Sequence, residues 1–115
     1  MGNSATVRVC YGITLPEDCE MDLGELEDAV ESFEGIKIVV YDSWDYPNYI
    51  IAIGDTFREE DWGVIQITFD DHPTDEYSHR LLAAYEAVKD KFEVEYAEFR
   101  TFEPKPTWVA ASFWG

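Results

Sequence analysis

Two histidines and a carboxylate lie close together in the stretch DDHPTDEYSH, residues 70–79, and could bind a metal ion. Asp75 and His79 are one helical turn apart and His72 precedes them, so a metal-dependent hydrolase is the activity that this set would support. The same stretch is also a good helix start, with Pro73 in the first turn and acidic residues where the helix dipole favours them. We favour the helix start and predict no metal site.

Catalytic signatures of other kinds are missing from the sequence. There is no nucleophile elbow, no phosphate-binding loop and no dinucleotide fingerprint, and carboxylates are so abundant that any acid–base pair is uninformative. The carboxylates of Asp55, Glu59, Glu60 and Asp61 gather around Arg58 but lack the glycine and the ligand spacing of a calcium loop, so we expect a linker or a hairpin tip there. We predict a non-enzymatic protein without a cofactor.

Charge is the most uneven feature of the chain. The sequence has 25 acidic and 8 basic residues, which gives a net charge of −17 at pH 7. Residues 17–34 contain no Lys, Arg or His, and nine of their side chains are acidic: Glu17, Asp18, Glu20, Asp22, Glu25, Glu27, Asp28, Glu31 and Glu34. Like charges three or four residues apart destabilise a helix, so this segment indicates a purpose other than folding.

The second predicted helix has a different exterior. Glu76 precedes Arg80 by four residues and Glu86 precedes Lys89 by three, an arrangement typical of an ordinary solvated face. Adaptation to high salt should make both helices acidic, so it does not explain the contrast. A surface that only aids solubility remains an alternative explanation of the acidic segment. Direct binding of nucleic acid is disfavoured, because the basic residues are few and scattered.

Aromatic residues gather in the stretch YDSWDYPNYI, residues 41–50. Tyr49 and Trp108 each follow a proline in two similar hexapeptides, PNYIIA and PTWVAA, so we expect both to pack inward at the start of a strand. Trp44 and Tyr46 have only approximate counterparts in the second half of the chain. Because carboxylates border them, these two are candidate anchors of a binding loop.

Hydrophobic periodicity predicts the secondary structure. Apolar residues alternate from Val7 to Leu15, and a helix should begin near residue 23, where Asp22 and Glu25 form a pair like a capping box. Gly35 should end this helix. The remaining predicted elements are strands at 36–40 and 49–53, a strand at 65–69, a helix from about Thr74 to Lys91, and strands at 92–96 and 108–113.

This order of elements predicts an α+β fold built from a tandem strand-helix-strand-strand repeat, with units at about 5–57 and 58–115. The expected architecture is a two-layer sandwich, in which a mainly antiparallel sheet of about six strands carries both helices on one face. The order resembles that of the gyrase-inhibitory-protein-like effector-binding domains, although no residue motif carries the resemblance. A chain of 115 residues fits a single domain.

The compartment can be predicted only from the lack of targeting signals. No apolar run is long enough to cross a bilayer, and the N-terminus lacks the pattern of a secretory signal, so we expect a cytoplasmic protein with no membrane partner. Cys10 and Cys19 are the only cysteines, and we expect both to be free thiols.

Our first hypothesis for function is a protein-binding module, and more specifically an inhibitor that mimics the charge of nucleic acid and docks on a basic, nucleic-acid-handling partner. The predicted binding residues are Glu17, Asp18, Glu20, Glu25, Glu27, Asp28, Glu31, Trp44 and Tyr46. The alternative is a small-ligand or effector-binding domain, whose cleft between the two units would be lined by Tyr11, Tyr41, Tyr96 and Trp108. The final strand could also pair with another copy of the chain to give a homodimer.

Overall fold

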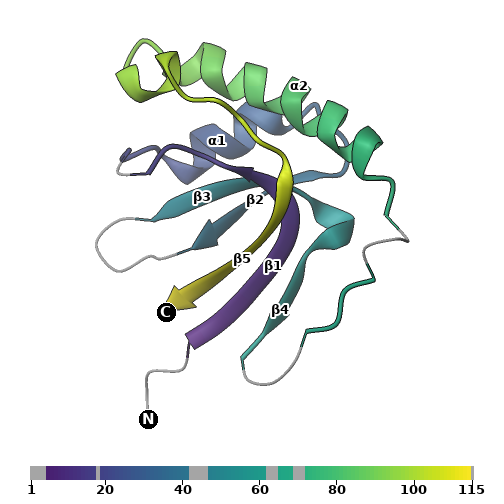
Figure 1. Ribbon diagram of the computed structural model, residues 1–115. Coiled ribbons are helices and arrows are strands. Elements are labelled where there is room, and N and C mark those ends of the chain that lie inside the picture. The colour runs from purple at the N-terminus through teal and green to yellow at the C-terminus, as the bar shows by residue number, and fades with distance from the viewer. Residues whose placement is uncertain (1–4, 18, 42–46, 62–64, 69–71, 115) are drawn as a thin grey trace.

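The computed structural model describes residues 5–17, 19–41, 47–61, 65–68 and 72–114. It has the predicted α+β class, with two helices and one antiparallel sheet of five strands (Figure 1). The helices and strands are, in chain order, β1 (Ala5–Thr14), α1 (Leu23–Val30), β2 (Ile36–Tyr41), β3 (Asn48–Ile53), β4 (Arg58–Glu60), α2 (Thr74–Phe92) and β5 (Thr107–Trp114). Within the described ranges, no helix combines the length and apolar character needed to cross a bilayer.

The strand β1 is the centre of the sheet. Along one edge it pairs with β5 over residues 5–12, and along the other edge it pairs with β4 over residues 7–9 and with β3 over residues 12–14. The strand β2 then pairs with β3. Between β3 and β4 the chain makes a 3₁₀ turn, η1 (Gly54–Thr56). The Thr56 hydroxyl bridges this break, because it accepts a hydrogen bond from the Tyr11 amide (2.8 Å) and donates one to the Ile53 carbonyl (2.7 Å).

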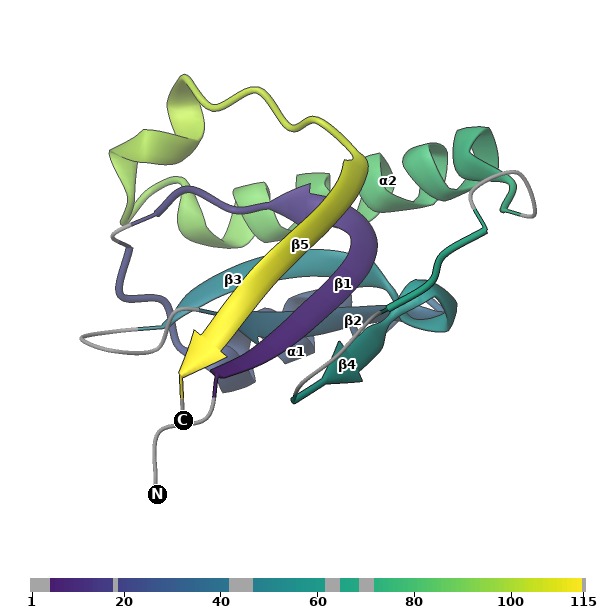
Figure 2. The same ribbon diagram turned by 60° about the horizontal axis from the view of Figure 1, so that its bottom comes forward.

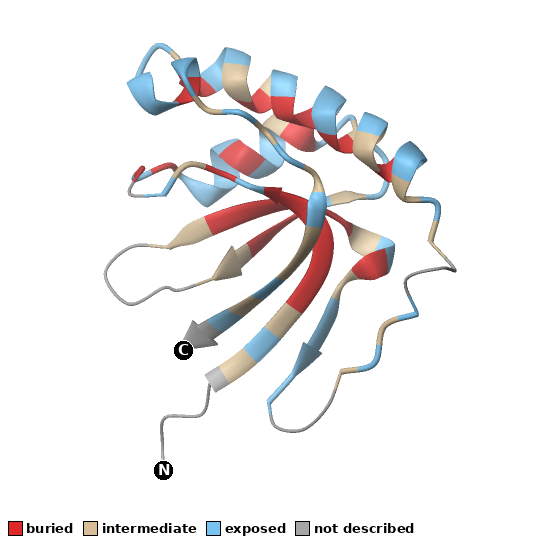
Figure 3. Ribbon diagram, in the orientation of Figure 1, coloured by how far each residue is buried: buried red, intermediate tan, exposed pale blue. Residues whose placement is uncertain are grey.

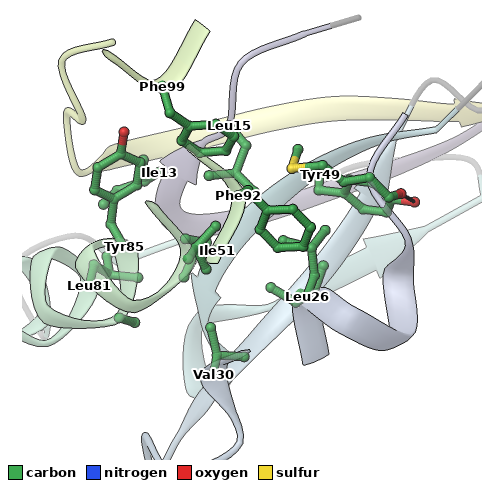
Figure 4. Close-up of a cluster of buried hydrophobic side chains, with 14 of the residues drawn as sticks. Ile13, Leu15, Leu26, Val30, Tyr49, Ile51, Leu81, Tyr85, Phe92 and Phe99 are labelled. Carbon is green, nitrogen blue, oxygen red and sulfur yellow. Dashed lines mark hydrogen bonds between the residues drawn. The ribbon is translucent and has the colours of Figure 1, made fainter. Parts of the chain in front are cut away.

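Both faces of the sheet bury apolar side chains. Successive residues of a strand point to opposite faces, so Ile13, Tyr49 and Ile51 face the helices while Cys10 and Ile50 face away from them. The larger core lies under α1 and α2, where side chains from both helices and from β1 and β3 converge (Figure 4). The second cluster consists of Cys10, Val39, Ile50 and Ala52. Both cysteines are buried and free, as predicted.

The helix α1 begins where the sequence predicts. The Asp22 carboxylate accepts a hydrogen bond from the Glu25 amide (3.0 Å), which satisfies one of the backbone donors left open at a helix start. Leu26 and Val30 are buried one turn apart and hold the helix on the sheet. The helix ends at Val30, earlier than expected, and two turns lead to Gly35, whose φ of 77° falls in the left-handed region that glycine adopts easily.

The helix α2 also matches its prediction, but the strand expected at 92–96 does not exist. Within α2, Leu81 and Val88 are buried two turns apart, and Phe92, Tyr96 and Phe99 follow at steps of four, four and three residues. These three therefore contact the core from the end of α2 and from the following 3₁₀ turn, η3 (Ala97–Arg100). Val94, which the strand pattern placed inward, is 85 % exposed. The alternation of apolar residues at 92, 94 and 96 was therefore a misleading signal.

The structure does not confirm that the second half of the chain repeats the first. Residues 65–68 form no strand, and the edge of β1 that such a strand could have used is already occupied by β3 and β4. The segment expected to be a linker instead supplies β4, which pairs with Val7–Val9 although all three of its side chains are exposed. The tandem repeat and the sixth strand are thus not confirmed, while the hexapeptide likeness holds locally, since Tyr49 and Trp108 both pack toward the helix-side core.

Candidate functional site

The acidic segment, residues 17–34, consists of α1, the loop before it and the turns after it. On α2, Figure 3 shows buried residues on the inner side and exposed residues on the outer side, and on α1 the buried residues are Leu26 and Val30. The described carboxylates of the segment are all exposed to solvent: Glu17, Glu20, Asp22, Glu25, Glu27, Asp28, Glu31 and Glu34. The structure therefore places a continuous stretch of anionic side chains over the turns of α1 and the loop before it.

The backbone of this segment is held by side chains from the rest of the molecule. Tyr49 donates to the Met21 carbonyl (3.1 Å), and Tyr96 donates to the Glu20 carbonyl (2.8 Å). Lys91 and Arg80, both on α2, donate to the Glu25 carbonyl (3.2 Å) and the Glu34 carbonyl (2.6 Å). These four donors fix the path of the segment from its loop to its last turn.

The same contacts leave the carboxylates without cations. Lys91 and Arg80 approach the segment closely enough to bond its main chain, yet among the described residues the one ion pair within 4 Å joins Arg8 to Glu59, on β1 and β4. Of the acidic side chains, Asp22 caps the helix and Glu17 accepts a long hydrogen bond from Tyr41 (3.5 Å). The other described carboxylates of the segment make no hydrogen bond or ion pair with the described residues.

Two of the holding tyrosines remain hydrogen-bond donors over a wide pH range. Burial raises the pKa of the Tyr49 phenol, and the nearby Asp22 carboxylate raises it further. The pKa of Tyr96 is also raised, first by desolvation and then by neighbouring negative charge, including that of Glu20. Since both phenols stay protonated at neutral pH, their bonds to the segment persist there.

A hollow of about 700 Å³ lies at the far end of the acidic segment. Its walls include Phe33 and Gly35 from the chain after α1, Asp55 from η1, and Arg80 from α2. The Arg80 guanidinium lies directly over Gly35, where a β-carbon would collide with it. Because the Arg80 cation lines the hollow and would repel a basic side chain, the hollow is not part of the candidate binding face.

Six of the predicted binding residues are described by the structure and are exposed to solvent. Glu17, Glu20, Glu25, Glu27, Asp28 and Glu31 all lie exposed on the acidic segment. Asp18, Trp44 and Tyr46 lie outside the described residues.

The alternative cleft of four aromatic residues is not formed. Tyr11 and Trp108 do meet, with ring centroids 5.3 Å apart, but Tyr11 is buried and bonds to Ser78 (2.8 Å). Tyr41 packs on the opposite face of the sheet, and Tyr96 packs against Phe92. The reason is the strand alternation, which sends Tyr11 and Tyr41 to different faces.

The three residues that were considered as metal ligands and set aside do not lie together. His72 packs its ring against Trp108 (5.2 Å between centroids), while Asp75 and His79 are exposed on the first turns of α2. In the part of the chain that the structure describes, no three His, Cys, Asp or Glu side chains are placed to share a metal ion.

Sequence reasoning missed the residues that support the acidic segment. Arg80 and Lys91 read as parts of an ordinary helix surface, and Tyr96 as part of a strand that does not exist. Their signal was indirect, since the sequence shows only that α2 carries basic residues and that the acidic segment has none. Comparisons with protein-family models, with curated proteins and with solved structures found no match to this chain.

Proposed function

We propose that the protein is a non-enzymatic binding module that docks the exposed carboxylates of the acidic segment on the basic surface of a protein partner. The partner class that fits this face best is a protein that handles nucleic acid, because such proteins carry rows of Lys and Arg placed to meet phosphates. In this hypothesis the module inhibits its partner by occupying the nucleic-acid site.

One observation carries the proposal. The carboxylates of Glu20, Glu25, Glu27, Asp28, Glu31 and Glu34 are exposed and make no ion pair among the described residues, although Lys91 and Arg80 bond to the main chain of the same segment. The cations thus fix the backbone and leave these carboxylates without an ion-pair partner. A surface that served solubility alone would not need its main chain held in this way.

A fixed row of charges favours binding for two physical reasons. The segment loses little conformational freedom on docking, because four side chains already hold its main chain. The negative potential of a chain with net charge −17 also speeds encounter with a basic surface, and this effect weakens as salt rises. Affinity should therefore fall steeply with ionic strength.

The test compares two triple charge reversals on immobilised protein. The α1-reversed variant carries Glu27→Lys, Asp28→Lys and Glu31→Lys, and the matched α2-reversed control carries Glu76→Lys, Glu86→Lys and Asp90→Lys, all at exposed positions. Both change the net charge equally. The input is the set of nuclease-treated lysate proteins that bind DNA-cellulose, since these have the surface that the proposal requires.

We expect at least one such protein to be retained by the wild type and by the α2-reversed control, and to be lost from the α1-reversed variant and at high salt. Circular dichroism melting of all three proteins serves as the folding check. Equal retention by the wild type and a folded α1-reversed variant would show that the acidic segment is not the docking face.

A further inference from the structure

The strand β5 has one side that no described strand covers. It pairs with β1 along its whole length, from Trp114 opposite Ala5 to Thr107 opposite Gly12, and it has no second neighbour in the sheet. Figure 2 shows β5 lying along β1, with β3 and β2 crossing behind it, and β2 approaches β5 without pairing with it. Alternate residues of such a strand direct their backbone N–H and C=O groups outward, where they can pair with another strand.

This edge lacks the usual protection against pairing. Thr107–Trp114 reads TWVAASFW and contains no charged residue, no proline and no bulge in its register with β1. Pro104 and Pro106 come before the strand and leave it free to pair. In a chain with net charge −17, this edge carries no charge of its own that would repel a second copy.

The surface beside this edge carries small, uncharged side chains. Ala110 and Ser112 are exposed, and Val7, which lies opposite Ser112 on β1, is 41 % exposed. Figure 1 shows that this end of β1 and β5 extends beyond the helices, so no helix layer blocks the approach of another sheet. Small side chains at 110–112 would let two strands meet without a clash.

We propose that β5 is a self-association edge, through which two copies of the chain pair antiparallel about a two-fold axis. Two identical strands in antiparallel register are self-complementary, so one patch serves both copies and the assembly closes at two. A ladder over the eight residues of β5 would add about eight backbone hydrogen bonds.

The salt dependence separates this proposal from docking by the acidic segment. Two copies of a strongly negative chain repel each other, and salt screens that repulsion. Self-association should therefore strengthen as salt rises, whereas binding of a basic partner should weaken. The two proposals rest on different residues and can fail independently.

Sedimentation equilibrium across a concentration series, at low and at high salt, tests the proposal. We expect the wild type to form a dimer that tightens with salt. Ala110→Glu combined with Ser112→Glu should raise the dissociation constant by about tenfold or more, because like charges then face each other across the two-fold axis. Ala110→Gln combined with Ser112→Gln, which has the same size without charge, should keep the dimer.

A wild type that stays monomeric at every concentration and salt would overturn the proposal, and so would equal dimerisation of the glutamate and glutamine variants. A second measurement covers the case in which the glutamates impair folding. Cysteine is placed singly at Ala110, Ala111 and Ser112, and oxidation should trap a disulfide-linked dimer for at least one of them. Because Ala111 packs against the cluster that contains Cys10, the three variants also carry Cys10→Ala, and failure at all three positions would also overturn the proposal.

Discussion

The helices α1 and α2 pack on the same face of the sheet and share one core, yet their outer surfaces follow different rules. On α2, Lys89 and Lys91 lie in the last turn, where they complement the helix dipole, and acidic residues lie in the first turn. On α1 the last turn holds no basic residue, and Glu27 lies four residues before Glu31. The arrangement on α2 stabilises a helix, and the arrangement on α1 costs stability.

This difference shows that the acidity of α1 is not a result of a shortage of nearby cations. Lys91 and Arg80 extend from α2 to the acidic segment and bond its carbonyl groups. Since the carboxylates themselves stay unpaired, the sequence keeps a local electrostatic cost of about 0.2 to 0.5 kcal/mol for each like-charge pair on α1. An electrostatic cost that persists although cations lie nearby is what we expect of a surface that binds a basic partner.

The largest predicted effect concerns the anchoring of α1. Leu26 is fully buried between α1 and the sheet, and α1 has only eight residues with which to hold itself in place. Leu26→Ala should lower the free energy of unfolding by about 2 to 5 kcal/mol in urea denaturation. Leu82→Ala on α2, at a side chain 37 % exposed, is the control and should cost well under half as much. Equal losses would mean that α1 is not fixed by its core contact.

A smaller effect is expected at the helix starts. Asp22 caps α1 through its bond to the Glu25 amide, whereas the residue before α2, Pro73, makes no side-chain cap. Asp22→Ala should cost about 1 kcal/mol, and Asp22→Asn should keep most of that stability because the amide oxygen can accept the same bond. Asp75→Ala on α2, which removes only a favourable charge at a helix start, should cost less. Thermal unfolding of the three variants measures this, and equal losses at Asp22 and Asp75 would contradict the assigned cap.

The smallest predicted effect has opposite signs on the two helices. Glu27→Lys places a cation four residues before Glu31 and should stabilise the protein by about 0.2 to 0.5 kcal/mol. Glu76→Lys places a cation four residues before Arg80 and should destabilise it by a similar amount. Both changes should shrink at high salt in chemical denaturation. If both substitutions changed the free energy of unfolding in the same direction, the proposed contrast between the outer surfaces of α1 and α2 would be wrong.

The sequence predicted most of the first half of the fold because its signals were local. The alternation of apolar residues from Val7 predicted β1, and the capping residue Asp22 predicted the start of α1. A single apolar stripe at helical spacing predicted α2. The missed elements depended on distant partners. The strand β4 has three exposed charged residues and exists because the edge of β1 accepts it, helped by the ion pair between Arg8 and the directly opposite Glu59.

The candidate site was predictable in charge but not in construction. Counting carboxylates was enough to find the acidic segment, since exposed positions on a helix can be read from its buried stripe. The bonds from Arg80, Lys91 and Tyr96 to main-chain carbonyls join residues 46, 66 and 76 positions apart. Any donor can bond any carbonyl, so no residue type in the sequence marks such a contact.

The most direct test of the docking face is a competition measurement with the partner that the capture experiment isolates. A fluorescent DNA duplex is bound to the purified partner, and its anisotropy is followed as the wild type, the α1-reversed variant or the α2-reversed control is added. The wild type and the α2-reversed control should displace the duplex, and the α1-reversed variant should require on the order of a hundredfold more protein. Displacement by the folded α1-reversed variant at the wild-type concentration would contradict the account.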